Sequence, residues 1–480
     1  MAEILTAPPE SDQVSPAKNP NMIVAVLAFA GIVVALMQTM VIPIVPDLPR
    51  LLGADAADTA WAVTATLLAA AVATPVVGRL GDMYGKRRML LVSLAILLAG
   101  SVVCAVSGAL PLFIVGRALQ GLAAGVIPLG ISIMRDELPA EKLGSSTALM
   151  SASLGVGGAI GLPLAAFVAE NFDWHVLFWA SAVLGAGAVA LVLTLVPESS
   201  RRTGGRFDLP GAIGLSAALV SLLLAVSKGA TWGWTSGTTL GLFAAAVVIL
   251  LVWGFYETRA AAPLVDLRTT MRRQVLFANL GGLAFGFSMF ATQLIIPQLL
   301  QLPAQTGYGL GRSLLTVGLV LAPQGLVVMA VAGLSAKVSA RFGPKVTLMI
   351  GALVVAGGYL LNLVLMTEIW HLILVSCVIG GGIGFAYGAL PLLVMGAVPV
   401  SETAAANALN TLLRSIGGSV ASAVCGVVLA QMTISFGGHA LPSENAFKVI
   451  MAVAAGAALV AFVLASFLPR QRGAVAKGAH

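Results

Sequence analysis

The chain has 480 residues, of which 59% are hydrophobic and only 9% are charged, and its mean hydropathy is +1.01. This composition excludes a soluble globular protein of this length. The formal net charge of +7 does not indicate nucleic-acid binding, because the basic residues stand in short segments between apolar runs. Apolar runs of about 20 residues recur from end to end, and each is long enough to cross a bilayer as a helix. Strand patterns of alternating polarity are absent, so the sequence predicts an all-α polytopic membrane protein.

Fourteen membrane spans are predicted. In chain order they cover residues 22–46, 59–79, 88–108, 111–134, 145–169, 174–197, 209–228, 236–256, 274–301, 312–335, 345–366, 371–398, 405–431 and 446–468. With the N-terminus inside, most of the 26 Lys and Arg fall on the cytoplasmic side, as the positive-inside rule expects. The other side receives only Arg50, Lys228, Arg312 and Lys448. We therefore expect a multi-pass membrane protein with both termini in the cytoplasm. Richness in Ala and Gly, and in Arg over Lys, indicates a GC-rich bacterium, so the expected location is a bacterial inner membrane.

The chain also contains an internal repeat. Ile42-Pro43 in the first span matches Ile296-Pro297 in the ninth, and Gly157-Gly158 in the fifth matches Gly417-Gly418 in the thirteenth. Two parallel six-helix halves around a central cavity are a transporter plan. The predicted organisation is a disordered cytoplasmic tail (1–21), an N-terminal six-helix half (22–197), two inserted helices (198–256), a cytoplasmic loop (257–273), a C-terminal six-helix half (274–468) and a cytoplasmic tail (469–480).

Charge is concentrated in the stretch GRLGDMYGKRR, residues 78–88, between the second and third spans. Lys86, Arg87 and Arg88 suffice as an anchor that keeps this loop in the cytoplasm. That role does not account for Asp82 or for the spacing of the glycines. Small residues let a tight loop pack against helix ends, and an acid there can meet a helix N-terminus or a nearby arginine.

The pattern Gly-x-Leu-Gly-Asp-x-x-Gly-Lys-Arg in this stretch resembles the signature loop of the major facilitator superfamily. Fourteen spans in the order six, two and six resemble its fourteen-helix drug–proton antiporter branch. The resemblance implies a major facilitator fold in which this loop latches the two halves in the outward-open state. Asp82 would be the acidic member of the latch and Arg79 its partner, and an anchor for topology alone is the alternative. The implied latch residues are Gly78, Arg79, Gly81, Asp82, Gly85, Lys86 and Arg87.

Two arginines lie inside predicted spans. GRALQGLAAG, residues 116–125, resembles the family's fourth-helix motif, which implies a coupling role for Arg117 with Gln120 behind it. Arg414 in LLRSIGGS resembles the thirteenth helix of the branch. A charge inside the membrane costs about 2.5 kcal/mol or more, so it normally faces a cavity or a partner. We expect coupling or anion contact at these residues, while bonding of Arg117 to helix-end carbonyls is the alternative.

The fifth span matches the branch's antiporter motif only in part. GVGGAIGLPLAA carries Gly157 and Gly161 four apart, and Pro163 comes one place late, so a bend is expected there. The branch's first-helix aspartate, two places before a threonine, is replaced by Met37 before Thr39. No acidic residue falls in the middle of a span, and the nearest lie at the outer face: Asp47, Asp58, Glu170 and Asp173. Since a buried carboxylate is the usual proton relay and counter-ion for cations, the expected substrate is a neutral or anionic amphiphile rather than a permanent cation.

Polar side chains inside spans are candidates for the lining of a substrate cavity, although such groups also serve as interhelical contacts. They are Gln38, Thr39, Gln293, Gln324, Tyr387 and Asn410. Cys104, Cys377 and Cys425 have no paired spacing, so no metal site is predicted, and no catalytic residue or cofactor is expected. No nucleotide-binding loop occurs, which disfavours ATP drive.

The predicted function is secondary active export of drugs or natural products by proton-coupled alternating access. Its partners are the small-molecule substrate, the proton and the lipid bilayer, without nucleic acid. A facilitator that imports a metabolite and an exporter of lipid-like molecules stay open as alternatives. A membrane enzyme is disfavoured because no His, Asp or Glu cluster has catalytic spacing.

Overall fold

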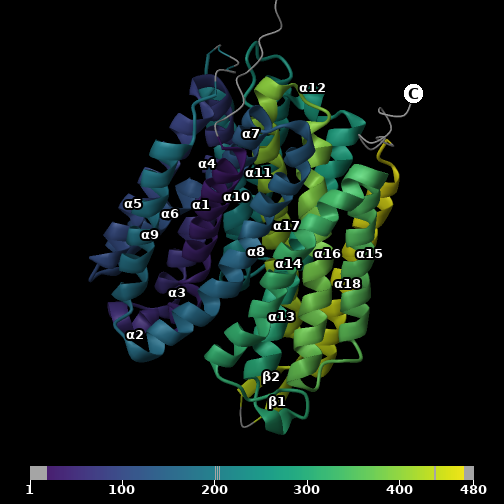
Figure 1. Cartoon of the computed structure of the whole chain (residues 1–480). Coiled ribbons are helices and arrows are strands. Elements are labelled where there is room, and N and C mark those ends of the chain that lie inside the picture. Colours follow the sequence, from purple (N-terminus) through teal and green to yellow (C-terminus); the bar gives the residue numbers. More distant parts are fainter. Residues whose placement is uncertain (1–18, 200–201, 203, 205, 437–438, 470–480) are drawn as a thin grey trace, which may run out of the picture.

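The computed structural model describes residues 19–199, 202, 204, 206–436 and 439–469. Within this part of the chain, 14 helices are long and apolar enough to cross a membrane. They run up and down in one bundle (Figure 1). Each of the fourteen predicted spans corresponds to one of them, so the predicted fold class is confirmed.

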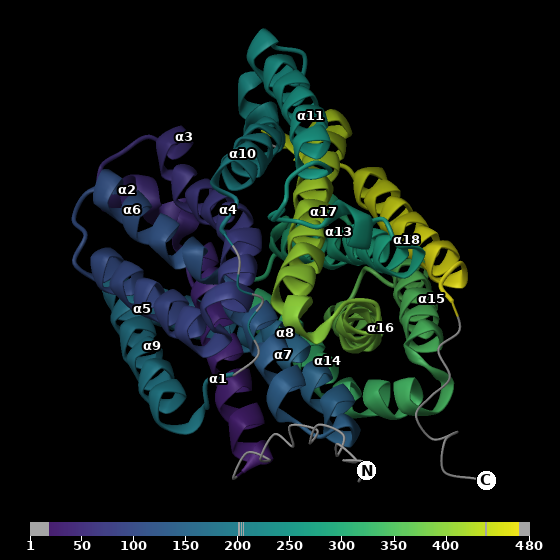
Figure 2. The same ribbon diagram turned by 90° about the horizontal axis from the view of Figure 1, so that it is seen from above.

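The spanning helices form two groups and an outlying pair when the bundle is seen from above (Figure 2). The N-terminal group comprises α1 (Pro20–Thr39), α4 (Trp61–Tyr84), α5 (Lys86–Ala105), the span made of α6 (Leu110–Gly121), η2 (Leu122–Gly125) and α7 (Val126–Glu137), α8 (Ala140–Asn171) and α9 (His175–Leu195). The C-terminal group comprises α13 (Arg273–Gln301), α14 (Leu314–Phe342), α15 (Pro344–Asn362), α16 (Ile369–Met395), α17 (Thr403–Gln431) and α18 (Glu444–Ser466). The outlying pair is α10 (Leu209–Trp232) and α11 (Gly237–Glu257).

Short elements connect the spans. They are η1 (Ile42–Asp47), α2 (Leu48–Leu52), α3 (Ala56–Thr59), α12 (Leu267–Thr270), η3 (Ala304–Thr306), η4 (Val400–Glu402), β1 (Thr433–Phe436) and β2 (His439–Pro442). The antiparallel hairpin β1–β2 departs from the strand-free chain that the sequence predicts. Each strand has only four residues and lies between α17 and α18, so it leaves no long alternating pattern to recognise.

Of the predicted tails, residues 1–18 and 470–480 lie outside the described residues. The tail predicted over residues 1–21 ends earlier than expected, because α1 already begins at Pro20. A proline suits the first turn of a helix, since its missing N–H has no partner there in any case.

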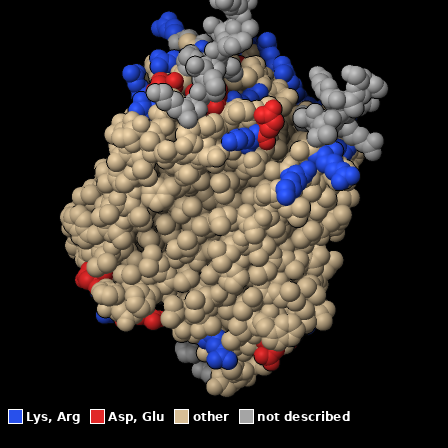
Figure 3. Space-filling model, viewed as in Figure 1, with Lys and Arg blue, Asp and Glu red and all other residues tan. Residues whose placement is uncertain are grey.

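The two ends of the bundle differ in charge. On the face shown in Figure 3, Lys and Arg gather mainly at the end where α7 and α12 lie, and the middle carries no charged side chain. We call this end the basic end; Lys86, Arg135, Lys142, Arg272 and Lys345 belong to it. The opposite end carries α2 and the β1–β2 hairpin. An uncharged band between two charged ends is the pattern of a protein embedded in a bilayer.

The predicted internal repeat has a counterpart in how the helices pack. A Cβ on Gly157 of α8 would lie 2.3 Å from the Cβ of Ala35 on α1. A Cβ on Gly417 of α17 would lie 2.0 Å from the backbone oxygen of Leu283 on α13. Glycines at equivalent places in the two halves therefore allow equivalent helix pairs to touch.

The two halves meet along α8 and α14, and along α4 and α17. At the first contact, a Cβ on Gly325 of α14 would lie 2.2 Å from the backbone oxygen of Gly155 on α8. The inserted helix α10 packs beside the second contact, with Leu215 and Leu219 in one apolar cluster with Ala71 and Leu412. In α11, by contrast, only 17% of an apolar stretch of 18 residues is buried inside the bundle, so this helix is the outer one of the inserted pair.

Candidate functional site

The stretch of residues 78–88, predicted as a loop, consists of the end of α4, Gly85 and the start of α5. We keep the name loop for this stretch, and it brings the N-terminal half against α17. Asp82, near the end of α4, is fully buried. Its carboxylate accepts hydrogen bonds from the backbone N–H groups of Ala404, at 3.2 Å, and Ala405, at 2.9 Å. These groups belong to the first turn of α17, where N–H groups lack partners within the helix and the helix dipole is positive. Asp82 of one half thus caps a helix of the other half.

Two glycines of the loop permit this approach. A Cβ on Gly78 would lie 2.6 Å from the Cβ of Ala408 and 2.9 Å from the backbone oxygen of Ala404. A Cβ on Gly81 would lie 2.3 Å from a methyl carbon of Leu129. Gly78 meets atoms that cannot move without shifting the backbone of α17, so this position needs glycine, whereas the methyl group met at Gly81 is the end of a flexible side chain.

Lys86 is the cationic partner of the buried acids. Its Nζ lies 2.7 Å from Oδ2 of Asp136 and 3.9 Å from Oδ1 of Asp82. All three side chains are almost fully buried, and Ser199 donates a further hydrogen bond of 2.6 Å to Oδ2 of Asp136. Burial keeps water from screening this group of charges, so its attractions are stronger than those of a surface pair.

Asp82 and Arg79, the partners expected from the resemblance, form no direct ion pair in the structure. No ion pair among the described residues includes Arg79, and its Nε is buried without a hydrogen-bond partner. Both oxygens of Asp82 are already occupied by the N–H groups of α17, and Lys86 supplies the nearby positive charge.

The rest of the loop is held within its own half. Gly85 has a φ of +115°, a conformation that favours glycine, and it lets α5 begin directly after α4. The Glu198 carboxylate accepts hydrogen bonds from the backbone N–H groups of Arg87 and Arg88 at the start of α5. The Arg87 guanidinium donates to the backbone oxygen of Leu193 at 2.6 Å. Of the predicted latch residues, Gly78 and Asp82 therefore contact α17 directly, whereas Gly85, Lys86 and Arg87 position the loop.

Arg135 forms a second contact between the halves, which the sequence analysis missed. Its guanidinium donates to Oγ1 of Thr403 at 2.6 Å, to the backbone oxygen of Val398 at 3.1 Å and to that of Pro399 at 3.4 Å. These acceptors flank the start of α17. In the sequence Arg135 is one of many basic loop residues, and backbone acceptors leave no side-chain pattern to pair it with.

Arg117 is enclosed within the N-terminal half. Only 1% of this residue is exposed. Its guanidinium donates to the backbone oxygen of Met37 at 3.1 Å, to that of Ala62 at 3.4 Å and to Oε1 of Gln120 at 2.6 Å. Gln120 in turn donates to Ser101 at 3.0 Å. Backbone and amide oxygens thus satisfy this charge without an acid, and none of them comes from the C-terminal half.

The predicted bend residues contact two different helices. A Cβ on Gly161 would lie 2.2 Å from Oγ1 of Thr39 on α1, while Pro163 faces Gly318 of α14. The Thr39 hydroxyl lies 3.1 Å from the backbone oxygen of Leu36 and 3.4 Å from that of Gly157. Residues Gly157, Gly161 and Thr39 therefore join α1 to α8, and Pro163 lies where α8 meets the C-terminal half. A bend at Pro163 stays a prediction.

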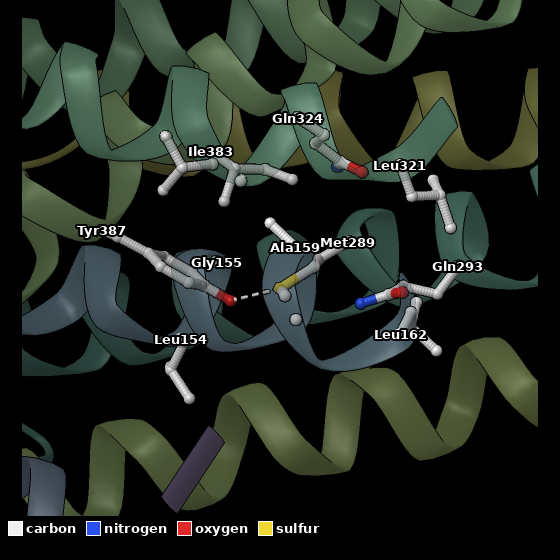
Figure 4. A pocket seen from close by; sticks show the side chains of 13 residues that line it. Leu154, Gly155, Ala159, Leu162, Met289, Gln293, Leu321, Gln324, Ile383 and Tyr387 are labelled. Carbon is white, nitrogen blue, oxygen red and sulfur yellow. Dashed lines mark hydrogen bonds between the residues drawn. The ribbon is translucent and has the colours of Figure 1, made fainter. Parts of the chain in front are cut away.

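A small cavity of about 30 Å³ lies between the two halves (Figure 4). Helix α8 supplies the wall from the N-terminal half, and α13, α14 and α16 supply the walls from the C-terminal half. The lining is mainly apolar, and its polar side chains are Gln293, Gln324 and Tyr387. The Tyr387 hydroxyl lies 2.7 Å from Sδ of Met289, as the dashed line in Figure 4 marks.

The other predicted cavity residues lie elsewhere. Gln38 is exposed near the C-terminal end of α1, and Thr39 makes the contact with α8 described above. Asn410 of α17 donates to Oδ1 of Asn279 on α13 at 3.0 Å. Sequence alone does not distinguish these positions, because the burial of a polar residue depends on the rotation of its helix. Arg414, one turn after Asn410, lies with its guanidinium carbon 4.4 Å from the centre of the Tyr387 ring.

Asp173, one of the acids at the opposite end, is held by the neighbouring His175. Asp173 accepts a hydrogen bond of 2.8 Å from the backbone N–H of His175, and its carboxylate also contacts the His175 ring. These two bonds lower the pKa of Asp173, so the group stays ionised at neutral pH. Within the described residues, no group of three or more His, Cys, Asp and Glu side chains is arranged to hold a metal ion.

Comparison with known proteins agrees with this architecture. The family model described as Major Facilitator Superfamily matches residues 27–422. Multidrug resistance protein 3 of Bacillus subtilis is 28% identical over 373 residues, which cover 77% of this chain and 72% of that protein. The tetracenomycin C resistance and export protein of Streptomyces glaucescens is 28% identical over 84% of this chain and 75% of its own length. An MFS-type transporter of Mycobacterium tuberculosis is 30% identical over 431 residues, which cover 88% of this chain but only 61% of that relative.

Solved structures show the same fold at low sequence identity. The human organic anion transporter MFSD10 (TETRAN) gives a TM-score of 0.66 at 15% identity, over 93% of this chain and 99% of that one. The proton:xylose symporter XylE gives a TM-score of 0.63 at 14% identity, over 95% and 97% of the two chains. These two likenesses concern the fold and not the substrate.

Proposed function

This chain belongs to the major facilitator superfamily, and we propose that it is a secondary active transporter that exports small amphiphilic compounds, such as drugs or natural products. It is a multi-pass membrane protein, and we place it in a bacterial inner membrane with both termini on the cytoplasmic side. The excess of Lys and Arg at the basic end supports this orientation. The names of the relatives, which include a multidrug resistance protein and an antibiotic export protein, support the substrate class.

One observation carries the proposal: the cavity is shared by the two halves. Its mainly apolar wall with three polar side chains suits a compound that has an apolar body and a few hydrogen-bonding groups. At about 30 Å³ it is far smaller than the roughly 300–1,000 Å³ of sites for drug-sized ligands. A substrate therefore requires the halves to move apart around this point.

The contacts at the basic end support a gate on the cytoplasmic side. Asp82 and Arg135 join the N-terminal half to the start of α17 there. Opening toward the cytoplasm requires both sets of hydrogen bonds to break. We propose that the predicted latch has this role and that alternating access depends on its breaking and re-forming.

We propose the proton gradient as the energy source and neutral or anionic amphiphiles as the preferred substrates. No acidic residue of the described chain lies in the middle of a spanning helix, so a cation would find no buried carboxylate as its counter-ion. The buried charges in the middle of the spans are Arg117 and Arg414. An arginine stays protonated, so Arg117, Gln120 and Arg414 serve coupling by moving with their helices and not by carrying the proton.

Transport in inside-out membrane vesicles tests the proposal. An imposed pH gradient quenches a pH-sensitive dye, and we expect neutral or anionic amphiphiles to release protons and restore the fluorescence. Vesicles without the protein provide the control. Intact cells that express the protein are expected to accumulate less of the same compounds until an ionophore collapses the gradient. Greater accumulation in expressing cells would indicate import and contradict export, and export without a proton signal would contradict the coupling alone.

A further inference from the structure

Arg414 on α17 is a buried cation whose hydrogen-bonding capacity is largely unused. Only 7% of the residue is exposed. Its Nη1 has no hydrogen-bond partner among the described residues, and its Nη2 has only a long bond of 3.4 Å to the hydroxyl of Thr411. None of the ion pairs of the described residues includes Arg414. Leaving a buried charge uncompensated is costly, so an arginine in a membrane span marks a functional site.

A comparison with Arg117 shows that burial alone does not explain this deficit. Arg117 is buried at least as deeply, yet three oxygens accept hydrogen bonds from it. The two arginines therefore differ in what surrounds them. Arg117 is already satisfied by its own half, whereas Arg414 retains donors for a partner that the described chain does not supply.

Further donors lie beside Arg414. A Cβ on Gly282 of α13 would meet Nδ2 of Asn410 at 3.0 Å and Cγ of Arg414 at 3.4 Å, so these two side chains share one small space. Asn410 donates to Asn279, whose own Nδ2 is buried and has no partner. The region thus offers two unpaired N–H donor groups, on Arg414 and Asn279. An excess of donors around a fixed positive charge favours an anion.

Tyr387 connects this region with the cavity. Its ring lines the cavity wall, and the Arg414 guanidinium lies over the same ring at 4.4 Å from its centre. The hydroxyl of Tyr387 is directed toward Sδ of Met289, which is a weak acceptor (Figure 4). A weak bond of this kind holds the ring in place without preventing its rotation.

We propose that Arg414 is the residue that binds the carboxylate of an anionic amphiphile in the substrate site, and that the Tyr387 ring covers it until the ligand moves the ring aside. The inference rests on the proposed function, because it assigns the anionic group of the substrate to one residue of the shared cavity. Once the halves have moved apart around the cavity, the apolar body of the ligand lies there beside Met289, and its carboxylate accepts hydrogen bonds from the free N–H groups of Arg414. Gln293 and Gln324 remain available for the other polar groups of the ligand.

Equilibrium binding of a matched pair of probes tests the proposal. The full chain in phosphatidylcholine nanodiscs is titrated with 1-pyrenebutyrate and with its uncharged amide, 1-pyrenebutanamide, and empty nanodiscs are subtracted. We expect the wild type to bind the carboxylate about 10-fold or more tightly than the amide, as a charge-assisted hydrogen bond predicts. Arg414→Gln is expected to weaken carboxylate binding about 10- to 100-fold and to leave the amide within about 2-fold. Equal affinity of the wild type for both probes would overturn the proposal.

Three further variants complete the test, and the first two guard against a folding defect in Arg414→Gln. Arg341→Gln removes one positive charge from an exposed position of α14 and serves as the matched control, with no expected change for either probe. Arg414→Lys keeps the charge but loses the forked donor geometry, so part of the carboxylate preference is expected to remain. Tyr387→Phe removes the bond to Met289, and it should speed association of the carboxylate but not of the amide. A carboxylate preference that survives Arg414→Gln unchanged, or equal acceleration of both probes by Tyr387→Phe, would overturn the inference.

Binding and transport separate this inference from the proposed function. A carboxylate preference that depends on Arg414, in a protein that moves neither probe across vesicles, would contradict export and keep the anion site. Transport of the amide without any carboxylate preference would keep export and overturn the anion site.

Discussion

The carboxylate of Asp82 on α4 accepts a hydrogen bond of 2.9 Å from the backbone N–H of Ala405 on α17, across the boundary between the two halves. A second bond, of 3.2 Å, joins the same carboxylate to the N–H of Ala404. A helix N-terminus is a suitable partner for an acid whose hydrogen bonds must break during the transport cycle. When Asp82 leaves α17, its carboxylate can bind water or another donor, and the neutral backbone N–H groups leave no buried charge on α17. Lys86 and Asp136 stay with the loop in its own half.

Replacing Asp82 with alanine is expected to favour opening at the basic end. Each charge-assisted hydrogen bond contributes about 1.5–3 kcal/mol, so the population of the open state should rise by about 10-fold or more. Spin labels at the exposed residues Tyr84 of α4 and Phe342 of α14 can report the separation of the halves in nanodiscs. We expect longer and broader distances in Asp82→Ala. The exposed residue Asp55 provides a control, and a distance distribution in Asp82→Ala equal to that of Asp55→Ala would contradict the latch.

Arg135 and Asp82 are expected to act as one unit. Both hold the start of α17, Arg135 through Thr403 and the preceding carbonyls and Asp82 through the first free N–H groups. Neighbouring interactions of this kind give coupling energies of about 0.5–3 kcal/mol in double-mutant cycles. Export rates of Asp82→Ala, Arg135→Gln and the double variant should show that the second change adds less than the first. Strictly additive losses would mean that the two contacts work independently.

Gly417 and Gly426 lie on the same helix and offer a matched pair. A Cβ on Gly417 would lie 2.0 Å from the backbone oxygen of Leu283, whereas nothing lies within 4 Å of a Cβ on Gly426. Gly417→Ala should therefore separate α13 from α17 and cost about 1–3 kcal/mol or more, while Gly426→Ala should be neutral or slightly stabilising. Thermal unfolding in detergent, followed by size-exclusion chromatography, measures the difference. An equal melting temperature for the two variants would show that the α13–α17 approach is not this close.

Arg117→Gln is expected to lower the stability of the protein and to leave its substrate preference unchanged. The substitution removes the guanidinium that donates hydrogen bonds to the backbone oxygens of Met37 and Ala62 and to Oε1 of Gln120. Each buried acceptor left without a partner lowers the stability of the fold by about 1–3 kcal/mol. The melting temperature should fall, and the ratio of carboxylate to amide affinity should stay at the wild-type value. A stable Arg117→Gln protein that loses its carboxylate preference would instead place Arg117 at the substrate.

The sequence predicts the fold well because runs of about 20 apolar residues and their basic loops are local signals. The residues of the cavity are predicted less well. Gln293, Gln324 and Tyr387 line it, whereas Gln38 and Asn410 do not, although all five are polar residues placed in predicted spans. Which way each one faces depends on packing between helices that are distant in the chain.

The hydrogen-bond partners of the latch residues could not be predicted from the sequence for a different reason. Asp82 binds the backbone of Ala404 and Ala405, 322 and 323 positions away, and alanine carries no polar side chain that would suggest a match. The surroundings of Arg117 and Arg414 were likewise not predictable, because both are arginines within predicted spans. Backbone oxygens satisfy the first, and only the folded arrangement shows that the second lacks such acceptors.

The paired glycines Gly157 and Gly417 have a consequence for how this protein tolerates change. If the halves descend from one duplicated unit, each contact that demands glycine in one half limits the choice of residue at its counterpart in the other. A mutational scan of α8 against α1 would then forecast the intolerant positions of α17 against α13 before they are measured. Positions at which the two scans disagree would mark where the halves have taken on separate tasks, and Met37 and Arg414 are the first places to look.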